Sequence, residues 1–599
     1  MQYLRQTYTL FSPYFDNNKY GYSRILVLLG IAISAILSAV SIIYVYEALT
    51  TLQAILIQPG AEFSVVAWGV LGCLGPSSVF AGFNAISHVM STWLSKELYH
   101  SVHKRFLERW IVDKGNYYIR FVKNGLSINA EEIMTSDVER AANSSVRLVG
   151  SWISALANFF VGSYQLWYLS TPLYINTSMV AFNLPGYMLF LAFGYSVLYS
   201  TIVGYFDKDL AVNDAQLRKN QADYKANFNH ISNHAEGIAL KRGNQREING
   251  LMDKLSNIDK VENTSMVAQS VLNFMQNVSG KAAYMFGLIL SAPGAISGKF
   301  DIFKAFSVSQ YFTNIVKFFS WSKENTTELA SLEVSMRKIT DIHVMLNEAD
   351  TLRTNSALKI NTVDDQFAIR NFSMRKPSGE HMLRNLSLQL PKGKVIKIQG
   401  SNGIGKTTLF RCFAGLWPYA QGEIILPGKD TDNSVRAYFI PQQCYFPYRE
   451  SLLAAITYPD SATTLDKAKR TRIQRLLKSF GFKNETLNRL EEKGEWHKEL
   501  SGGQQQKIAI IGALIKHPKP DVIFIDEGTN ALDPKSKAQI ERYLKSELPD
   551  TSIVAVVHDD KPEKPANGLF FDYKLSARLP RKQPRIPTFT LHKICKPQN

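Results

Sequence analysis

The stretch Val395–Phe413, VIKIQGSNGIGKTTLFRCF, decides the fold of the C-terminal part of the chain. Val395 to Gln399 has the pattern of a buried strand, and a helix is expected to follow. Gly400 to Thr407 matches the pattern G-x-x-x-x-G-K-[ST]. Glycines lack a Cβ, so backbone N–H groups can approach an anion, and the N-terminus of the following helix faces the same anion. The stretch therefore predicts a site for nucleotide phosphates.

The loop and the first helical residues supply the candidate phosphate ligands. Lys406 is long enough to reach the β- and γ-phosphates, and the hydroxyl of Thr407 can bind Mg²⁺. The candidate nucleotide-binding residues of this segment are Gly400, Ser401, Asn402, Gly403, Ile404, Gly405, Lys406, Thr407 and Thr408.

Two further strands place acidic and basic side chains where a hydrolytic site needs them. The segment DVIFIDEGTNALD contains an apolar strand that ends in two acids. Asp526 can hold Mg²⁺ through water, and Glu527 can act as the general base for the attacking water. The β-rich run Ala555–Val557 ends in His558, which can contact the γ-phosphate. Together with the glycine-rich loop, these residues predict nucleotide hydrolysis.

The string LSGGQQQK, Leu500–Lys507, resembles the signature of the ABC ATPases. Gln442 in FIPQQ resembles the Q-loop glutamine of that family, which is expected at Mg²⁺ and at the contact with a membrane domain. Residues 531–533 resemble the D-loop, with Asp533 among the nucleotide-site residues, and His558 matches the switch histidine. The resemblance covers Phe367 to Ser576 and implies an α/β P-loop ABC ATPase that uses ATP and Mg²⁺.

The same resemblance implies a dimer. In ABC ATPases each ATP lies between the P-loop of one chain and the signature of the other. Ser501, Gly502 and Gly503 would then bind the γ-phosphate across the interface, with Gln504 beside them. One P-loop and one signature in this chain imply a homodimer with two ATP sites. The metal-site candidates are Thr407, Gln442 and Asp526.

One position departs from the family pattern. Many ABC ATPases stack the adenine base on an aromatic residue shortly before a proline, but here Lys376 precedes Pro377 in SMRKPSG. We expect looser nucleotide selectivity, with Lys376 or Arg375 covering the base instead.

The N-terminal half contains apolar runs long enough to cross a bilayer as helices. Weaker runs follow, so that the sequence predicts an all-α, six-span membrane domain in front of the ATPase. The predicted spans are Ile25–Tyr46, Phe63–Met90, Val149–Tyr168, Pro185–Phe206, Val267–Ala295 and Phe306–Trp321. Asn84, His88, Asn158 and Gln165 are polar residues within these spans, where a substrate path and helix-to-helix hydrogen bonding are both possible roles.

Loop charges predict the orientation of the spans. The segments 47–62 and 170–185 contain no Lys or Arg, whereas 96–147 and 207–260 are rich in both. Because positively charged loops stay in the cytoplasm, both termini and the ATPase domain are expected inside. The N-terminus lacks the pattern of a cleaved signal. The string NHAEGIALKRGNQRE, within 233–247, predicts a short helix between two long ones that touches the ATPase.

Composition narrows the function further. A net charge of +17 would suit nucleic acid, but the charge is spread over loops and helices without an RNA- or DNA-binding motif. Cytoplasmic membrane loops account for it better, so no nucleic-acid partner is expected. The four cysteines form no C-x-x-C pair, which argues against a zinc site or a disulfide framework.

Several strings, including GLWPYAQGEI and GEWHKELSGGQQQ, resemble the D-type ABC subfamily, whose bacterial relatives have a BacA/SbmA-type membrane domain. SINAEEIMTSDVER departs from that group's usual string. The resemblance implies an ATP-driven translocase in a lipid bilayer, with a bacterial inner membrane as the expected location. The expected cargo is a hydrophilic compound such as cobalamin or a peptide. The alternatives are an exporter of acyl-CoA, lipids or drugs with the same fold, and a membrane-anchored regulatory ATPase.

The expected organisation has four parts. They are a membrane domain at 1–322, a cytoplasmic helix and linker at 323–366, the ABC domain at 367–576 and a basic tail at 577–599.

Overall fold

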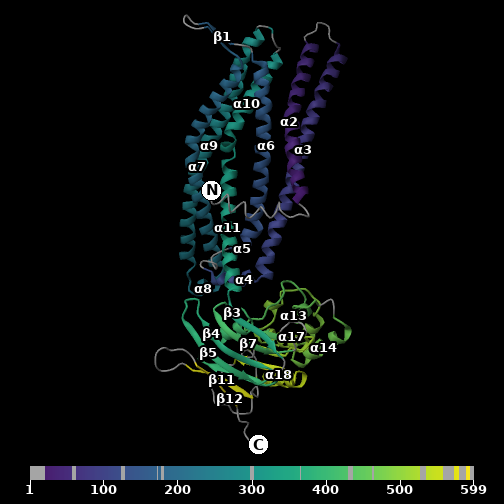
Figure 1. The fold of residues 1–599 in the computed structure, drawn as a ribbon, viewed down its shortest axis with the longest axis vertical. Helices are drawn as coiled ribbons and strands as arrows, with labels where there is room; N and C mark the ends of the chain where they lie inside the picture. Colours follow the sequence, from purple (N-terminus) through teal and green to yellow (C-terminus); the bar gives the residue numbers. More distant parts are fainter. Residues whose placement is uncertain are drawn as a thin grey trace. The chain divides into compact units, whose positions relative to one another are not determined.

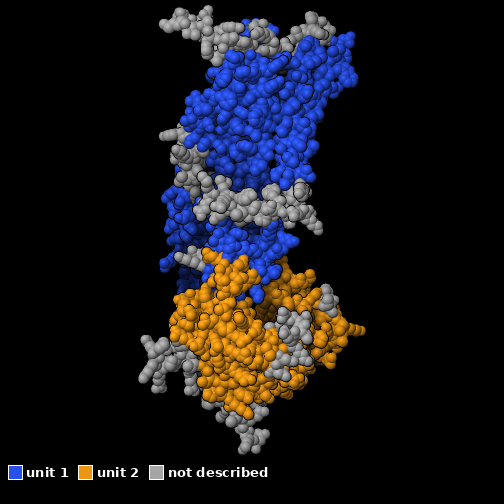
Figure 2. Space-filling view, in the orientation of Figure 1, with its two compact units in different colours: residues 1–347 blue, residues 348–599 orange. Residues whose placement is uncertain are grey.

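In the computed structural model the chain forms two compact units, residues 1–347 and 348–599 (Figure 2). The structure describes residues 21–56, 62–122, 129–170, 173–176, 181–296, 298, 302–363, 366–401, 403–428, 436–461, 465–526, 534–556, 572–578 and 588–593. The four-part division expected from the sequence stays a prediction.

The first unit is built from long helices (Figure 1). Its helical elements are α2 (Gly21–Leu56), α3 (Phe63–Leu107), η1 (Glu108–Val112), α4 (Gly115–Tyr118), η2 (Ile119–Phe121), α5 (Ala130–Glu132), η4 (Ile133–Asp137), α6 (Val138–Leu169), α7 (Tyr187–Asn233), α8 (Ala235–Leu240), α9 (Asn244–Ile296), α10 (Ile302–Glu324) and α11 (Thr326–Thr354). A short antiparallel hairpin, β1 (Leu173–Asn176) and β2 (Ala181–Leu184), joins α6 to α7. The short helix predicted between two long ones is present as α8, and its contact with the ATPase stays a prediction.

Four helical stretches in the described residues are long and apolar enough to cross a membrane, judged by length and composition. They are Ile25–Leu56, Phe63–Val112, Ala130–Leu169 and Tyr187–Gly204. The fifth and sixth predicted spans lie in α9 and α10, which are helical as expected but more polar. A total of six spans therefore stays a prediction.

The polar character of α10 has a packing explanation. This helix lies against α6, α7 and α9, and its apolar residues Val308, Phe312 and Ile315 are fully buried. Its hydroxyl groups donate to carbonyls of the same helix, as Ser309 Oγ does to Ala305 O at 3.2 Å. Gly287 of α9 lets the backbone of Ser309 approach closely, because a Cβ there would lie 2.5 Å from Ser309 Cα. An interior helix needs less hydropathy than one that faces lipid.

The second unit contains two sheets and surrounding helices (Figure 1). Its strands are β3 (Ala357–Val363), β4 (Phe367–Arg375), β5 (His381–Leu390), β6 (Val395–Gly400), β7 (Ala420–Pro427), β8 (Ala437–Ile440), β9 (Val522–Asp526), β10 (Ser552–Val556), β11 (Tyr573–Arg578) and β12 (Thr588–Lys593). Its helices are α12 (Lys406–Phe413), α13 (Leu452–Thr457), α14 (Lys467–Ser479), α15 (Asn484–Asn488), α16 (Trp496–Glu499), α17 (Gly502–Ile515) and α18 (Pro534–Glu547).

The larger sheet has the order β12-β11-β6-β10-β9-β8. Its strands run parallel except β12, which pairs antiparallel with β11. Every residue of β9 and β10 is buried, as expected for central parallel strands covered on both faces. Parallel strands end at the same edge of a sheet, so the last residues of β6, β9 and β10, which are Gly400, Asp526 and Val556, lie along one edge.

The smaller sheet has the order β3-β7-β4-β5. Its first strand, β3, pairs in parallel with β7 and includes residues 361–363, which the sequence pattern suggested as part of a linker. Alternation of exposed and half-buried residues along β3 explains why this edge strand lacked a clear apolar signal.

Candidate functional site

The glycine-rich loop connects β6 to α12 and takes a backbone conformation that favours glycine. Gly403 has φ +78° and Gly405, which caps α12, has φ +102°. The methyl carbons of Met374 and Met382 lie close to Gly405, so a Cβ there would meet them at 3.1 and 3.0 Å. Positive φ and close packing both explain why glycine is needed at this turn.

Lys406 is buried at the start of α12, with 6% of its surface exposed. Its Nζ donates to Gly400 O at 2.7 Å and to Ser401 O at 3.3 Å. The ammonium group is thus held over the loop whose backbone N–H groups are expected to receive phosphate. This arrangement supplies a buried positive charge at the end of β6, where an anionic ligand would be stabilised.

The predicted magnesium ligands come together from positions far apart in the chain. Thr407 Oγ1 donates to Asp526 Oδ1 at 3.4 Å, and Asp526 is 7% exposed at the end of β9. A hydroxyl and a carboxylate at adjacent positions are oxygen ligands of the kind that Mg²⁺ prefers. In the described residues no group of three or more His, Cys, Asp or Glu side chains could hold a metal. Mg²⁺ bound through one or two protein ligands and the substrate's phosphates needs no such group.

Aromatic side chains pack between the helix that carries Thr407 and the strand that carries Asp526. Phe524, two residues before Asp526, is buried between Phe439 of β8 and Phe413 of α12. The ring centroids are 4.7 Å and 4.8 Å apart, with interplanar angles of 9° and 23°. Each such pair contributes about 0.5–1.5 kcal/mol beyond the burial of its area. Sequence reasoning missed this stack, because a phenylalanine within an apolar strand carries no sign of its partners.

The signature segment begins a different helix. Ser501 caps α17, its Oγ accepting from Gln504 N at 3.3 Å while Ser501 N donates to Gln504 Oε1 at 2.9 Å. Ser501 and Gly502 are exposed. Helix α17 packs on α13, α14 and β8, whereas α12 packs on β6 and β9. The structure therefore presents the start of the signature at the surface.

The remaining predicted nucleotide-site residues fall into two groups. Ile404 is buried below the loop, Thr408 is half-buried in the first turn of α12, and Gln442 is exposed two residues after β8. Asn402, Glu527, Asp533 and His558 lie outside the described residues.

The position expected to cover the adenine base is a tight turn. Lys376 Nζ forms an ion pair with Glu380 Oε2 at 2.7 Å, and Trp417 Nε1 donates to the carbonyl of Arg375 at 2.9 Å. The Lys376 ammonium is therefore already paired within its own turn.

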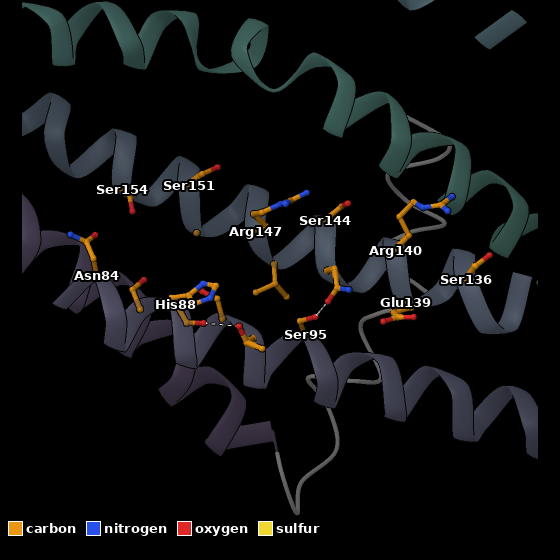
Figure 3. Close-up of a pocket in the computed structure, with 16 residues that line it drawn as sticks. Asn84, His88, Ser95, Ser136, Glu139, Arg140, Ser144, Arg147, Ser151 and Ser154 are labelled. Atoms are coloured by element: carbon orange, nitrogen blue, oxygen red, sulfur yellow. Dashed lines mark hydrogen bonds between the residues drawn. The ribbon is translucent and has the colours of Figure 1, made fainter. Parts of the chain in front are cut away.

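The first unit contains a cavity of about 740 Å³ between α3 and α6 (Figure 3). Apart from Val146 and Gly150, polar side chains line it: Asn84, Ser87, His88, Ser91, Thr92, Ser95, Ser136, Glu139, Arg140, Asn143, Ser144, Arg147, Ser151 and Ser154. Their spacing of three or four residues places each set on one face of its helix. Asn84 and His88 are thus brought to a cavity, whereas Asn158 and Gln165 do not line it.

Many hydroxyls in this cavity already donate to their own helix. Thr92 Oγ1 donates to His88 O at 2.9 Å, and Ser151 Oγ donates to Leu148 O at 3.0 Å. Such oxygens still offer lone pairs to a ligand that carries N–H or O–H groups. Polar side chains within spanning helices usually face a bundle interior or a water-filled path, because lipid cannot satisfy them.

Comparisons with known proteins agree with both units. Residues 10–296 match the family model described as ABC transporter transmembrane region 2, and residues 383–530 match the model described as ABC transporter. An inner membrane ABC transporter ATP-binding protein, YddA, of Escherichia coli is 23% identical over 80% of this chain and 82% of its own. An uncharacterized ABC transporter ATP-binding protein of Haemophilus influenzae is 26% identical over 78% of this chain and 74% of its own.

A plant relative and a solved structure extend the likeness. The ABC transporter D family member 1 of Arabidopsis thaliana is 21% identical over 86% of this chain and 38% of its own length. The structure of a bacterial Atm1-family ABC exporter with ATP bound shares the fold, with a TM-score of 0.65 and 15% identity over 92% of this chain and 94% of that one. The matches to both units, in this order, identify the chain as an ABC transporter in which a helical membrane domain is fused to an ABC ATPase that couples ATP hydrolysis to transport.

Proposed function

We propose that two copies of this chain form a transporter that moves a hydrophilic cargo across a bacterial inner membrane. The observation that carries the choice of cargo is the polar cavity between α3 and α6. An acyl chain in such a cavity would remove water from its charged side chains and from the unused lone pairs of its hydroxyl and amide groups without replacing the lost hydrogen bonds, which costs free energy. A cargo rich in N–H and O–H groups would satisfy them. Cobalamin and peptides have this character.

We propose that the nucleotide site of the second unit binds ATP together with Mg²⁺. Lys406 and the loop 400–408 hold the phosphates, and Thr407 and Asp526 hold Mg²⁺ directly or through water, with Gln442 nearby. When bound, Mg²⁺ would neutralise charge on the phosphates.

Residues beyond the described strands complete the proposed chemistry. Glu527 follows Asp526 directly and would orient and deprotonate the attacking water. His558 follows β10, which lies between β6 and β9 in the sheet, so the strand order supports a γ-phosphate contact.

The homodimer is supported by the exposed signature. Ser501 and Gly502 are exposed at the start of a helix that packs on α13, α14 and β8, and the half-buried Gly503 and Gln504 follow them. An exposed start of the signature is what contact with the nucleotide of a second copy would require. Asp533 would lie near the same interface. The loop charges support both termini and the ATPase in the cytoplasm. Strings shared with the D-type and BacA/SbmA-like branch support, but do not define, the subfamily.

Uptake of radiolabelled cargo into proteoliposomes tests this function. Cyanocobalamin, a labelled peptide and palmitoyl-CoA would be compared in the wild type and in Glu527→Gln, with ATP outside. We expect ATP-dependent movement of a hydrophilic probe that falls by about 10²- to 10⁴-fold in the variant, the usual contribution of a general base. Movement of palmitoyl-CoA alone would refute the hydrophilic cargo. Hydrolysis without movement of any probe would favour a regulatory ATPase.

A further inference from the structure

Helix α11 connects the two units of the chain. The chain passes from the first unit to the second between Asn347 and Glu348, inside α11. This helix is therefore the covalent connection between the ATPase unit and the membrane unit. What α11 contacts within the first unit decides where a movement of the ATPase unit would be felt.

Apolar and polar contacts fix α11 to the segments around the cavity helices. Its residues Met336, Ile339, Ile342 and Leu346 share a buried core with residues of α3, η2, η4 and α6. Three groups of polar contacts follow one another along α11. They join Glu328 to Ser144 and Arg147, Ser335 and Lys338 to Asp137, and His343 and Asn347 to Arg109.

The middle contact anchors the helix. Asp137 is 1% exposed at the end of η4, directly before α6. It accepts from Lys338 Nζ at 2.9 Å and from Ser335 Oγ at 3.3 Å. Loss of a partner of a buried carboxylate is strongly destabilising, so this contact holds the start of α6 against α11.

The first contact reaches the cavity itself. Glu328 accepts hydrogen bonds from the guanidinium of Arg147 and from the hydroxyl of Ser144, and both of these residues line the cavity. These hydrogen bonds, that from Arg147 first, hold the pKa of the Glu328 carboxyl below its usual range. The carboxylate is thus charged at neutral pH, and it connects α11 to two side chains of the cavity wall.

We propose that Glu328 is a positioning residue that passes the ATP-driven movement of α11 to the cavity wall through Arg147 and Ser144. The inference rests on the proposed transport function. The proposal assigns Glu328 no contact with ATP. Removal of the Glu328 charge should therefore leave ATP hydrolysis intact, while the cavity no longer responds to ATP hydrolysis. This separation of hydrolysis from cavity movement distinguishes positioning from a purely structural role.

Labelling of an introduced cysteine tests the proposal without knowledge of the cargo. Ser91→Cys places a thiol in the cavity. The rate at which a membrane-impermeant thiosulfonate labels this variant is measured with and without ATP and Mg²⁺. The labelling rate of the protein without the introduced cysteine is subtracted. We expect ATP to change the labelling rate about fivefold or more, the lower range of coupling between sites. In Ser91→Cys with Glu328→Gln, the rate should not respond to ATP although hydrolysis continues. Glu328→Asp, which keeps the charge, should restore part of the response.

Two matched controls lie on the same helices. Glu333→Gln removes a carboxylate of α11 that is 68% exposed and forms an ion pair at 3.4 Å with Arg337, one turn further along the same helix. Ser78→Cys places a thiol on α3 outside the cavity, and its labelling should not respond to ATP. A response that survives Glu328→Gln, or that Glu333→Gln abolishes equally, would overturn the role of Glu328. If the Ser91→Cys protein hydrolyses ATP but its labelling rate does not change with ATP, the transport cycle is refuted, and this inference with it.

Discussion

Replacement of Lys406 by methionine tests the phosphate site directly. Methionine has a similar length but no charge and no donor, so the packing of a 6% exposed side chain is largely kept. In the structure, Lys406 Nζ donates to the carbonyls of Gly400 and Ser401 at 2.7 and 3.3 Å. Phosphate binding would exchange these bonds for bonds to charged oxygens.

The size of the effect follows from that exchange. A hydrogen bond that involves a charged group contributes about 1.5–3 kcal/mol. The two bonds from the Lys406 ammonium to neutral carbonyls are taken at the lower end, about 1.5 kcal/mol each, and bonds to charged phosphate oxygens at about 2–3 kcal/mol each, so the exchange favours phosphate binding by about 1–3 kcal/mol. Because about 1.4 kcal/mol corresponds to a factor of ten, Lys406→Met should weaken ATP binding by about 5- to 150-fold.

Equilibrium titration of the purified protein with a fluorescent ATP analogue and Mg²⁺ measures this change. Lys394→Met is the matched control, because Lys394 is an exposed lysine directly before β6 and its loss removes the same charge. Thermal unfolding without nucleotide should show both variants folded. A loss of affinity below about fivefold for Lys406→Met, or an equal loss for Lys394→Met, would refute the assignment of this site.

Two further substitutions test the metal ligands and the helix packing. Asp526→Asn removes the carboxylate beside Thr407 and should raise the Mg²⁺ concentration for half-maximal ATP hydrolysis by about tenfold or more, with ATP binding in the absence of Mg²⁺ unchanged. Gly287→Ala places a Cβ 2.5 Å from Ser309 Cα and should destabilise the membrane unit by about 1–3 kcal/mol, read as a lower thermal midpoint. Gly280→Ala in the same helix meets no atom within 4 Å, and an equal loss there would contradict the packing argument.

The nucleotide site was largely readable in the sequence because its chemistry depends on local backbone geometry. A glycine-rich turn between a strand and a helix must be contiguous in the chain, so the pattern from Gly400 to Thr407 predicts both the fold of the segment and its ligand. The acids at the end of β9 were recognisable for the same reason. Their pairing was not, since Thr407 and Asp526 are 119 residues apart and meet only because β6 and β9 end at one edge of the sheet.

The cavity between α3 and α6, by contrast, was not readable in the sequence. Asn84 and His88 were recognisable as polar residues in an apolar run, but most of the cavity residues on α6 lie in the segment 96–147, which reads as a basic cytoplasmic segment. Polar residues at helical spacing look alike whether they face solvent or another polar helix. Only the packing of α3 beside α6 separates these two possibilities.

The sequence by itself determined the order of the two units, the long helices of the first and the phosphate-binding turn of the second. Each of these depends on apolar periodicity or on a contiguous motif, which short-range interactions decide. Tertiary structure alone decided which distant residues touch: Phe524 between Phe413 and Phe439, and Glu328 against Ser144 and Arg147. Such contacts depend on how helices and strands pack in space, and one sequence carries no record of the partner across that packing.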